Sequence, residues 1–338
     1  MHRRYQKKMS KKITITGDGS WATALAYVLL KNGTEVIWHI RTPEILESLK
    51  KNNFNSHYLR FIHFNGLRPT LCASLNDAIS QSNQLLVVVP AAFIQEVFHP
   101  VAPSMLKDKQ IISVTKGLIP DKQITPCTFF NEYLQVSPEN LAFVSGPSHA
   151  EEVAEEKSTF LGVFSQNTEL AGEFADMLRN TFINTIVSSD ISGAEYASAM
   201  KNVMAIAAGI CHGLGYGDNF SAVLAAYASR EIRDFLNIAV PAERDFNTFP
   251  YLGDLLVTLY SQHSRNRIFG NMIGRGYTIK AAQMEMEMIA EGYYACAALS
   301  ETARRLNISV PVCNAVNNIL YKNAEPRSEI QQLVFNLR

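Results

Sequence analysis

Residues 13–40, ITITGDGSWATALAYVLLKNGTEVIWHI, contain the pattern that sets the class of fold. A short β-prone run ends at Gly17, a glycine-rich turn follows, and apolar residues then recur at helical spacing from Ala22 to Lys31. Asn32-Gly33 is a typical helix C-terminal signal, and the apolar run over 35–40 predicts a second strand. Strand, glycine-rich turn, helix and strand in this order are the context that a dinucleotide-binding fingerprint requires.

The glycines of that turn predict where a dinucleotide binds. Gly17 and Gly19 permit a tight turn and a close approach of the backbone to a pyrophosphate, and Ala22 at the third glycine position still permits close packing. The pyrophosphate would lie at the helix N-terminus, where free N–H groups and the helix dipole favour an anion. Glycine turns after strands are common, so this prediction depends on the surrounding order of elements.

The end of the second strand bears on the choice of cofactor. No acidic residue stands there to bind a ribose hydroxyl; Arg41 does instead, with His39 nearby. An arginine at this place accommodates a 2′-phosphate, so the sequence allows NAD or NADP and favours NADP, unless Arg41 is simply a surface residue.

Further apolar runs predict a doubly wound parallel sheet. They cover residues 85–90, 111–115, 141–144, 160–164 and 182–187. Pro90, Lys116 and Ser148 follow three of these runs, and loops at the carboxyl ends of parallel strands are where such sheets bind ligands. Lys116 is therefore a candidate ligand-binding residue, although a solvated loop lysine would fit the same pattern.

The pattern changes to helices alone after Ser189-Asp190. At about 150 residues per domain, a chain of 338 residues is long enough for two domains. We expect an α/β fold: a Rossmann-type dinucleotide-binding domain over 1–188, with a basic tail at 1–11, followed by an all-helical substrate-binding domain over 189–338.

The central helix of the second half is expected over 193–210, GAEYASAMKNVMAIAAGI, where small and apolar residues surround a single lysine, Lys201. A lysine in such a helix is destabilising unless something pairs with it. Either Lys201 reaches solvent along its own aliphatic stem, or it is a desolvated amine whose pKa falls toward neutrality and which can donate and accept protons.

Composition argues against several classes of function. Lys+Arg and Asp+Glu are 31 each, so no global charge favours nucleic acid or a membrane surface. No apolar run approaches the roughly 18 residues of a membrane span, and no secretory signal follows the basic start. The 5 cysteines lack a C-x-x-C and the 8 histidines lack H-E-x-x-H, which predicts no metal site and reduced thiols in the cytoplasm.

Two polar clusters follow in the helical half. One is Gly253-Asp254-Leu255, and the other is Ser264-Arg265-Asn266-Arg267. Arginine with serine and asparagine beside it suits a phosphate, through forked donors and neighbouring polar groups. The second cluster would equally suit a surface salt-bridge patch.

Taken together, these motifs resemble the bacterial NAD(P)-dependent glycerol-3-phosphate dehydrogenase family over about residues 13–333. The matching stretches are GDGSWATALA (17–26), VVVP (87–90), TKGL (115–118), SGPSHA (145–150), KNVMAIAAGI (201–210), GDLLVT (253–258), SRNRIFG (264–270) and AEG (290–292). Each is weak alone, but their shared order makes coincidence implausible.

The resemblance implies reversible reduction of dihydroxyacetone phosphate to sn-glycerol 3-phosphate for phospholipid synthesis, by a cytoplasmic homodimer. It implies that Lys201 is the proton donor and acceptor, with Lys116 and Asp254 as its catalytic partners. To the cofactor-binding residues Gly17, Gly19 and Arg41 of the turn and the strand end, the resemblance adds Ser20, Trp21, Lys116, Ala150, Arg265, Ile289 and Glu291. The implied substrate-binding residues are Lys116, Gly146, Ser148, Lys201, Asp254, Ser264, Arg265 and Asn266.

The chain departs from the family pattern at four places. Ala22 replaces a glycine, Ile40 replaces an arginine that recurs one place later, residues 245–251 replace a glycine-rich lead-in, and Ala226-Tyr227-Ala228 replaces Thr-Arg-Gly. The last two changes flank the expected substrate cleft and are expected to loosen, reshape or silence it. The alternatives are therefore a related dehydrogenase of another polyol phosphate or hydroxy acid, and a catalytically impaired dinucleotide-binding paralogue.

Overall fold

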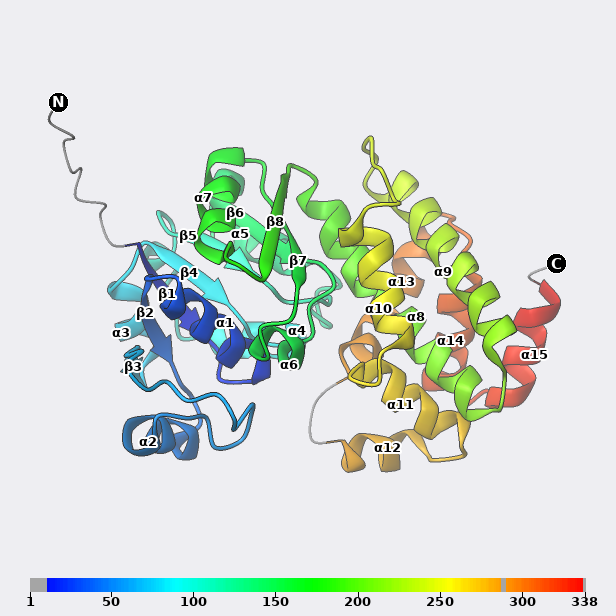
Figure 1. Cartoon of the computed structure of the whole chain (residues 1–338). Helices are drawn as coiled ribbons and strands as arrows, with labels where there is room; N and C mark the ends of the chain where they lie inside the picture. Colours follow the sequence, from blue (N-terminus) through cyan, green and yellow to red (C-terminus); the bar gives the residue numbers. More distant parts are fainter. Residues whose placement is uncertain (1–10, 287–289, 337–338) are drawn as a thin grey trace, which may run out of the picture.

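The computed structural model describes residues 11–286 and 290–336. Figure 1 shows two lobes, one built on a sheet and drawn in blue to green, the other made of helices and drawn in green to red. The strands are β1 (Lys12–Thr16), β2 (Glu35–His39), β3 (Thr70–Cys72), β4 (Gln84–Val87), β5 (Gln110–Ser113), β6 (Leu141–Ser145), β7 (Thr159–Phe164) and β8 (Ile183–Ser188). The helices of the first lobe are α1 (Ser20–Lys31), α2 (Pro43–Asn52), α3 (Leu75–Ser80), α4 (Ala91–Phe98), α5 (Pro126–Glu132), α6 (Ala150–Ala154) and α7 (Thr168–Leu178), with short 3₁₀ turns η1 (Pro103–Met105) and η2 (Pro138–Asn140).

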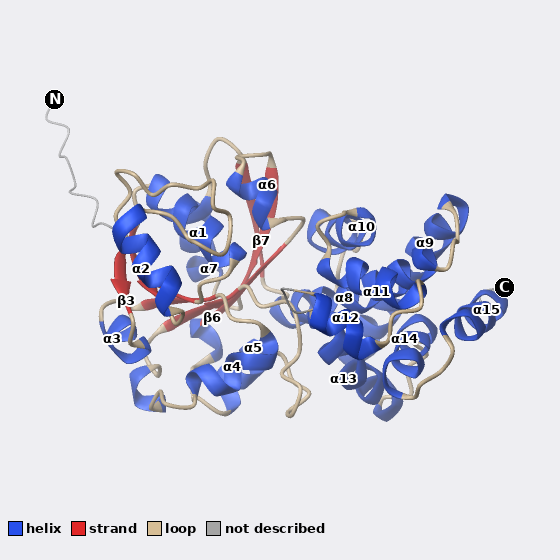
Figure 2. Ribbon diagram, turned by 90° about the horizontal axis from the view of Figure 1, so that it is seen from below, coloured by secondary structure: helices blue, strands red, loops and turns tan. Residues whose placement is uncertain are grey.

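The sheet has the order β3-β2-β1-β4-β5-β6-β7-β8 and is parallel except where β6 pairs antiparallel with β7. Its register brings Ile15 beside Trp38 on one side and beside Leu86 on the other, so the ends of β1, β2 and β4 reach the same edge. Helices α1 and α7 cover one face and α4 and α5 the other (Figure 2). Covering on both faces explains why the central strands are continuously apolar. The expected doubly wound sheet is confirmed, with β3 as an additional short edge strand.

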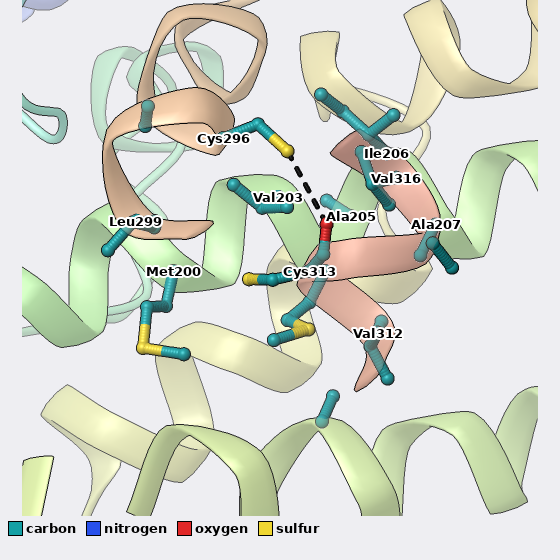
Figure 3. Packing of buried hydrophobic residues seen from close by; sticks show 14 of the residues in the cluster. Met200, Val203, Ala205, Ile206, Ala207, Cys296, Leu299, Val312, Cys313 and Val316 are labelled. Carbon is teal, nitrogen blue, oxygen red and sulfur yellow. Dashed lines mark hydrogen bonds between the residues drawn. The ribbon is translucent and has the colours of Figure 1, made fainter. Parts of the chain in front are cut away.

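The second lobe is helical from α8 (Ile191–Gly213) onward. The others are α9 (Asp218–Ala239), the π-helical turn η3 (Phe249–Gly253), α10 (Asp254–Tyr260), α11 (Arg265–Gly274), α12 (Ile279–Glu285), α13 (Glu291–Arg305), α14 (Pro311–Tyr321) and α15 (Pro326–Asn336). The expected central helix is therefore longer than 193–210 and is buried along most of its length. Figure 3 shows Met200 and Val203 of this helix in one apolar cluster with residues of α13 and α14, among them Leu299 and Val316.

Glycines let α8 and α11 approach each other at backbone distance. A Cβ atom at Gly209 would lie 2.1 Å from the carbonyl oxygen of Arg267, and one at Gly270 would lie 2.1 Å from that of Ile206. Gly213 and Gly274 meet one turn further on. This contact fixes the N-terminus of α11, which carries Arg265, relative to the segment of α8 that carries Lys201.

Candidate active site

One cleft of the described chain takes its walls from both lobes. The sheet lobe contributes the β1–α1 turn and the loops after β4, β5 and β6, and the helical lobe contributes α8, α10 and the starts of α11 and α13. The predicted site residues on its walls are Gly17, Gly19, Ser20, Trp21, Arg41, Lys116, Ser148, Ala150, Lys201, Asp254, Ser264, Arg265, Asn266 and Glu291. Gly146 contacts one of these residues, because Nζ of Lys116 donates to the carbonyl oxygen of Gly146 at 3.1 Å. Ile289 lies outside the described residues.

The β1–α1 turn has the shape that a pyrophosphate needs. Gly17 has φ +120°, and a Cβ atom there would lie 2.2 Å from the carbonyl oxygen of Val88, so the position requires glycine. A Cβ atom at Gly19 would meet no atom within 4 Å, which leaves open space in front of the first N–H groups of α1. The turn is held by the indole N–H of Trp38, which donates to the Gly17 carbonyl at 2.7 Å. These residues fit a dinucleotide bound at the N-terminus of α1.

Lys201 is buried and paired. Its side chain is 6% exposed, its Nζ lies 2.5 Å from Oδ1 of Asp254, and it also donates to Oγ1 of Thr258 at 3.0 Å. The alternative that this lysine reaches solvent along its stem is therefore wrong. Asp254 is held from its other side, since Nζ of Lys116 lies 3.4 Å from its Oδ2 and the Ser145 hydroxyl donates to the same oxygen at 3.0 Å.

Burial and charge set the protonation of this cluster. Burial lowers the pKa of Lys201 to about 7, against the attraction of Asp254 and with the repulsion of Lys116. Burial alone would raise the pKa of Asp254, but Lys116 and Lys201 outweigh it and hold that pKa below its ordinary value. The site thus places an amine that gains and loses a proton near neutral pH beside a permanent carboxylate.

Polar groups from α11 form another part of the wall. Ser264 caps α11 by accepting from the backbone N–H of Arg267 at 3.3 Å, and Arg265 is exposed at the first position of the helix. The side-chain oxygen of Asn266 accepts from the N–H of Gly292 at 2.9 Å, which fixes the amide. A helix N-terminus with an accessible guanidinium suits a phosphate.

Sequence reasoning missed several residues that orient the site. Asn202 donates to the carbonyl oxygen of Lys116 at 2.7 Å and so joins α8 to the loop after β5. Thr258 stands one helical turn after Asp254, a spacing that would have identified it. His149 and His263 lie 5.8 Å apart between ring centres, one on each lobe, and burial lowers the pKa of His149 to about 4. No spacing in the sequence connects these two histidines.

The altered lead-in before Asp254 packs against the sheet lobe. Phe249 lies 5.6 Å from Phe160 of β7, and Tyr251 lies 6.4 Å from Phe164, measured between ring centres. The Tyr251 hydroxyl donates to Oδ2 of Asp190 at 2.5 Å, and Asp190 in turn accepts from the N–H of Gly193 in the first turn of α8. This segment therefore ties together the two lobes next to Asp254. Tyr227, at the other altered place, packs against the helical core.

Tyr251→Phe tests the contribution of this tie to stability. The substitution removes one donor from the partly buried carboxylate of Asp190, whose side chain is 15% exposed, and a hydrogen bond to a charged group contributes about 1.5–3 kcal/mol. We expect a decrease of that size in the free energy of unfolding, measured by urea denaturation. Tyr277→Phe, at a tyrosine 49% exposed, is the matched control and should change it by less than about 0.5 kcal/mol. Equal denaturation midpoints for both variants would contradict the prediction.

Residues 11–286 and 290–336 have neither a cluster of metal ligands nor a helix suited to span a membrane. They contain no group of three or more His, Cys, Asp or Glu residues placed to hold a metal ion. No helix in these ranges has the length and apolar character needed to cross a bilayer.

Comparisons with known proteins agree over nearly the whole chain. Residues 12–171 match the model for the N-terminus of NAD-dependent glycerol-3-phosphate dehydrogenase, and residues 190–331 match the model for its C-terminus. The glycerol-3-phosphate dehydrogenase [NAD(P)+] of Clostridium acetobutylicum is 34% identical over 328 residues, 95% of this chain and 96% of that protein. Its counterpart from Fusobacterium nucleatum is 36% identical over 96% of each chain. The crystal structure of glycerol-3-phosphate dehydrogenase from Coxiella burnetii superposes with a TM-score of 0.89 at 28% identity, covering 96% of this chain and 99% of that one.

Proposed function

This chain belongs to the NAD-dependent glycerol-3-phosphate dehydrogenase family, and we propose that its cleft interconverts dihydroxyacetone phosphate and sn-glycerol 3-phosphate. It is an NAD(P)-dependent oxidoreductase acting on a CH–OH group. The observation that carries the proposal is the buried contact of Lys201 with Asp254, between the β1–α1 turn and the N-terminus of α11.

Lys201 is the proton donor in the direction of reduction. A reduced nicotinamide, when bound in the cleft, would supply the hydride for the ketone carbon. The oxygen then gains negative charge, which the ammonium of Lys201 stabilises before it transfers a proton. Asp254 and Thr258 hold Nζ of Lys201 in one position, and Lys116 adds a second positive charge on the other side of Asp254. In the opposite direction the neutral amine of Lys201 accepts the proton.

The substrate phosphate binds at the start of α11, remote from the reacting carbon. Arg265 supplies the charge, with Ser264 and Asn266 beside it, and binding energy gained there orients the ketone at Lys201. The dinucleotide is assigned mainly to the domain over 1–188 and the substrate mainly to the domain over 189–338. Gly146 and Ser148 contact the substrate from the dinucleotide-binding domain. Ser20, Trp21, Arg41, Ala150 and Glu291 are proposed cofactor contacts, and Glu291 already accepts from the N–H of Ala91 at 3.3 Å.

Arg265→Ala is expected to raise the KM for dihydroxyacetone phosphate by roughly 10-fold to 100-fold, because a charge-assisted hydrogen bond contributes about 1.5–3 kcal/mol. The effect on kcat should be smaller, since the phosphate does not react. Arg275→Ala, at the exposed far end of the same helix, is the matched control and should leave KM unchanged. An unchanged KM in Arg265→Ala would remove this residue from phosphate binding.

A spectrophotometric assay with NADH and NADPH, each with dihydroxyacetone phosphate, tests the proposal as a whole. We expect oxidation of at least one reduced nicotinamide that depends on this ketone. Activity on another polyol phosphate or hydroxy acid alone would support a related dehydrogenase. Dinucleotide binding without turnover would support an impaired paralogue, which the altered segments at Tyr227 and Phe249–Tyr251 motivate.

The cellular role is also a proposal. We infer a cytoplasmic homodimer whose product feeds phospholipid synthesis, because the family resemblance implies it. Light scattering after size-exclusion chromatography tests the homodimer, and a mass of one chain would contradict it.

A further inference from the structure

Asp18 lies between the two glycines of the β1–α1 turn, and its side chain crosses to the end of β2. Its Oδ2 accepts from the backbone N–H of Arg41 at 3.2 Å and from that of Thr42 at 2.9 Å. Asp18 and Arg41 both line the cleft. A carboxylate from the first turn is therefore fixed against the segment that joins β2 to α2.

This position determines the cofactor in dinucleotide-binding folds of this kind. An acidic residue at the end of the second strand accepts a hydrogen bond from the ribose 2′-hydroxyl of NAD, whereas an arginine there accommodates the 2′-phosphate of NADP. Here the strand ends in His39, followed by Ile40 and Arg41, and offers no acid of its own. The carboxylate of Asp18 instead reaches the end of β2 from the β1–α1 turn and supplies the acidic group that the strand itself lacks.

The backbone N–H groups and the imidazole at this place already have hydrogen-bond partners, and the guanidinium of Arg41 lies exposed beside Glu96. Asp18 accepts from both backbone N–H groups, and a guanidinium nitrogen of Arg41 lies 3.8 Å from a carboxylate oxygen of Glu96. Nδ1 of His39 lies 3.1 Å from Oγ1 of Thr16. Burial lowers the pKa of His39, against the attraction of Asp18, so this imidazole is neutral at pH 7 and adds no positive charge.

We propose that Asp18 makes this enzyme select NAD over NADP, by accepting a hydrogen bond from the ribose 2′-hydroxyl and repelling a 2′-phosphate. The inference rests on the dinucleotide site of the proposed function. It assigns NAD, whereas Arg41 alone favours NADP. A carboxylate has two acceptor oxygens, so Oδ1 serves the hydroxyl while Oδ2 keeps the two backbone contacts. Like charges brought together in a binding site strongly disfavour the wrong ligand.

The test is direct binding by isothermal titration calorimetry, without substrate, using NADH and NADPH and then AMP and adenosine 2′,5′-bisphosphate, which differ only in the 2′-phosphate. We expect the wild-type protein to bind NADH about tenfold or more tightly than NADPH, and AMP more tightly than the bisphosphate. Asp18→Asn keeps an oxygen for the N–H groups of Arg41 and Thr42 but removes the charge. It should reduce the NADH-to-NADPH preference about tenfold. Glu44→Gln, an exposed acid in the first turn of α2, removes the same charge nearby and should leave the preference unchanged.

Three results would overturn the role of Asp18. They are wild-type binding of NADPH at least as tight as that of NADH, an unchanged preference in Asp18→Asn, and an equal shift in Glu44→Gln. The wild-type measurement decides the question even if Asp18→Asn fails to fold. Binding of neither dinucleotide would contradict the proposed function as well, whereas tight binding of both without preference would contradict the role of Asp18 alone.

Discussion

Replacing Lys201 by alanine is expected to lower kcat for dihydroxyacetone phosphate by roughly two to four orders of magnitude, the usual contribution of a positioned general acid. The dissociation constant for the dinucleotide should be unchanged, because the β1–α1 turn is built from other residues. Asp254 keeps contacts with Lys116 and Ser145 in the variant, so its carboxylate is not left alone in the cleft. The measurements are steady-state kinetics by nicotinamide absorbance and a dinucleotide titration of the same protein.

The pH dependence separates a proton-transfer role from a structural one. Because the pKa of Lys201 is about 7, the ammonium that donates in the reductive direction is lost as the pH rises through that value. In the oxidative direction the neutral amine is the base, so the rate should fall as the pH decreases through the same value. Both limbs should disappear in Lys201→Ala and persist in Lys280→Ala, an exposed lysine of α12. Turnover like that of the wild type in Lys201→Ala would exclude the lysine from the mechanism.

Features that depend on neighbours in sequence could be predicted. The β1–α1 turn, the continuously apolar β4 and the helix around Lys201 all follow from periodicity and glycine placement within short windows. Most of the site residues that the sequence and the family resemblance indicated line the cleft. The sequence of its helix could not decide whether the amine of Lys201 is exposed or buried, because its burial against Asp254 depends on how α10 packs on α8.

Contacts between distant segments could not be predicted. The carboxylate of Asp18 reaches the end of β2 only because β1 and β2 lie in parallel register, with Thr16 beside His39. In the sequence, Arg41 stands at the end of the second strand without an acidic neighbour, a pattern that favours NADP. The altered lead-in was likewise expected to loosen, reshape or silence the cleft, since a change of composition does not show that Tyr251 meets Asp190. The short strand β3 has too few residues to produce a period.

Gly270→Ala is expected to destabilise the protein by about 3 kcal/mol or more, which is severe overpacking. The added Cβ atom would lie 2.1 Å from the carbonyl oxygen of Ile206 and 3.0 Å from its Cα, and neither backbone atom can rotate away. Helices α8 and α11 must therefore separate, which moves Arg265 relative to Lys201. The midpoint temperature of thermal denaturation and kcat/KM should decrease together. In Arg265→Ala, by contrast, we expect the midpoint temperature to stay at the wild-type value.

Gly172→Ala provides the matched control, because this glycine lies within α7 and its added Cβ atom would meet no atom within 4 Å. Alanine is favoured over glycine inside a helix by about 0.5–1 kcal/mol, so this variant should be as stable as the wild type or slightly more stable. The two substitutions add the same methyl group to a helix and differ only in what it meets. Equal stability of both variants would mean that α8 and α11 do not cross at backbone distance, and the position of Arg265 opposite Lys201 would lose its structural basis.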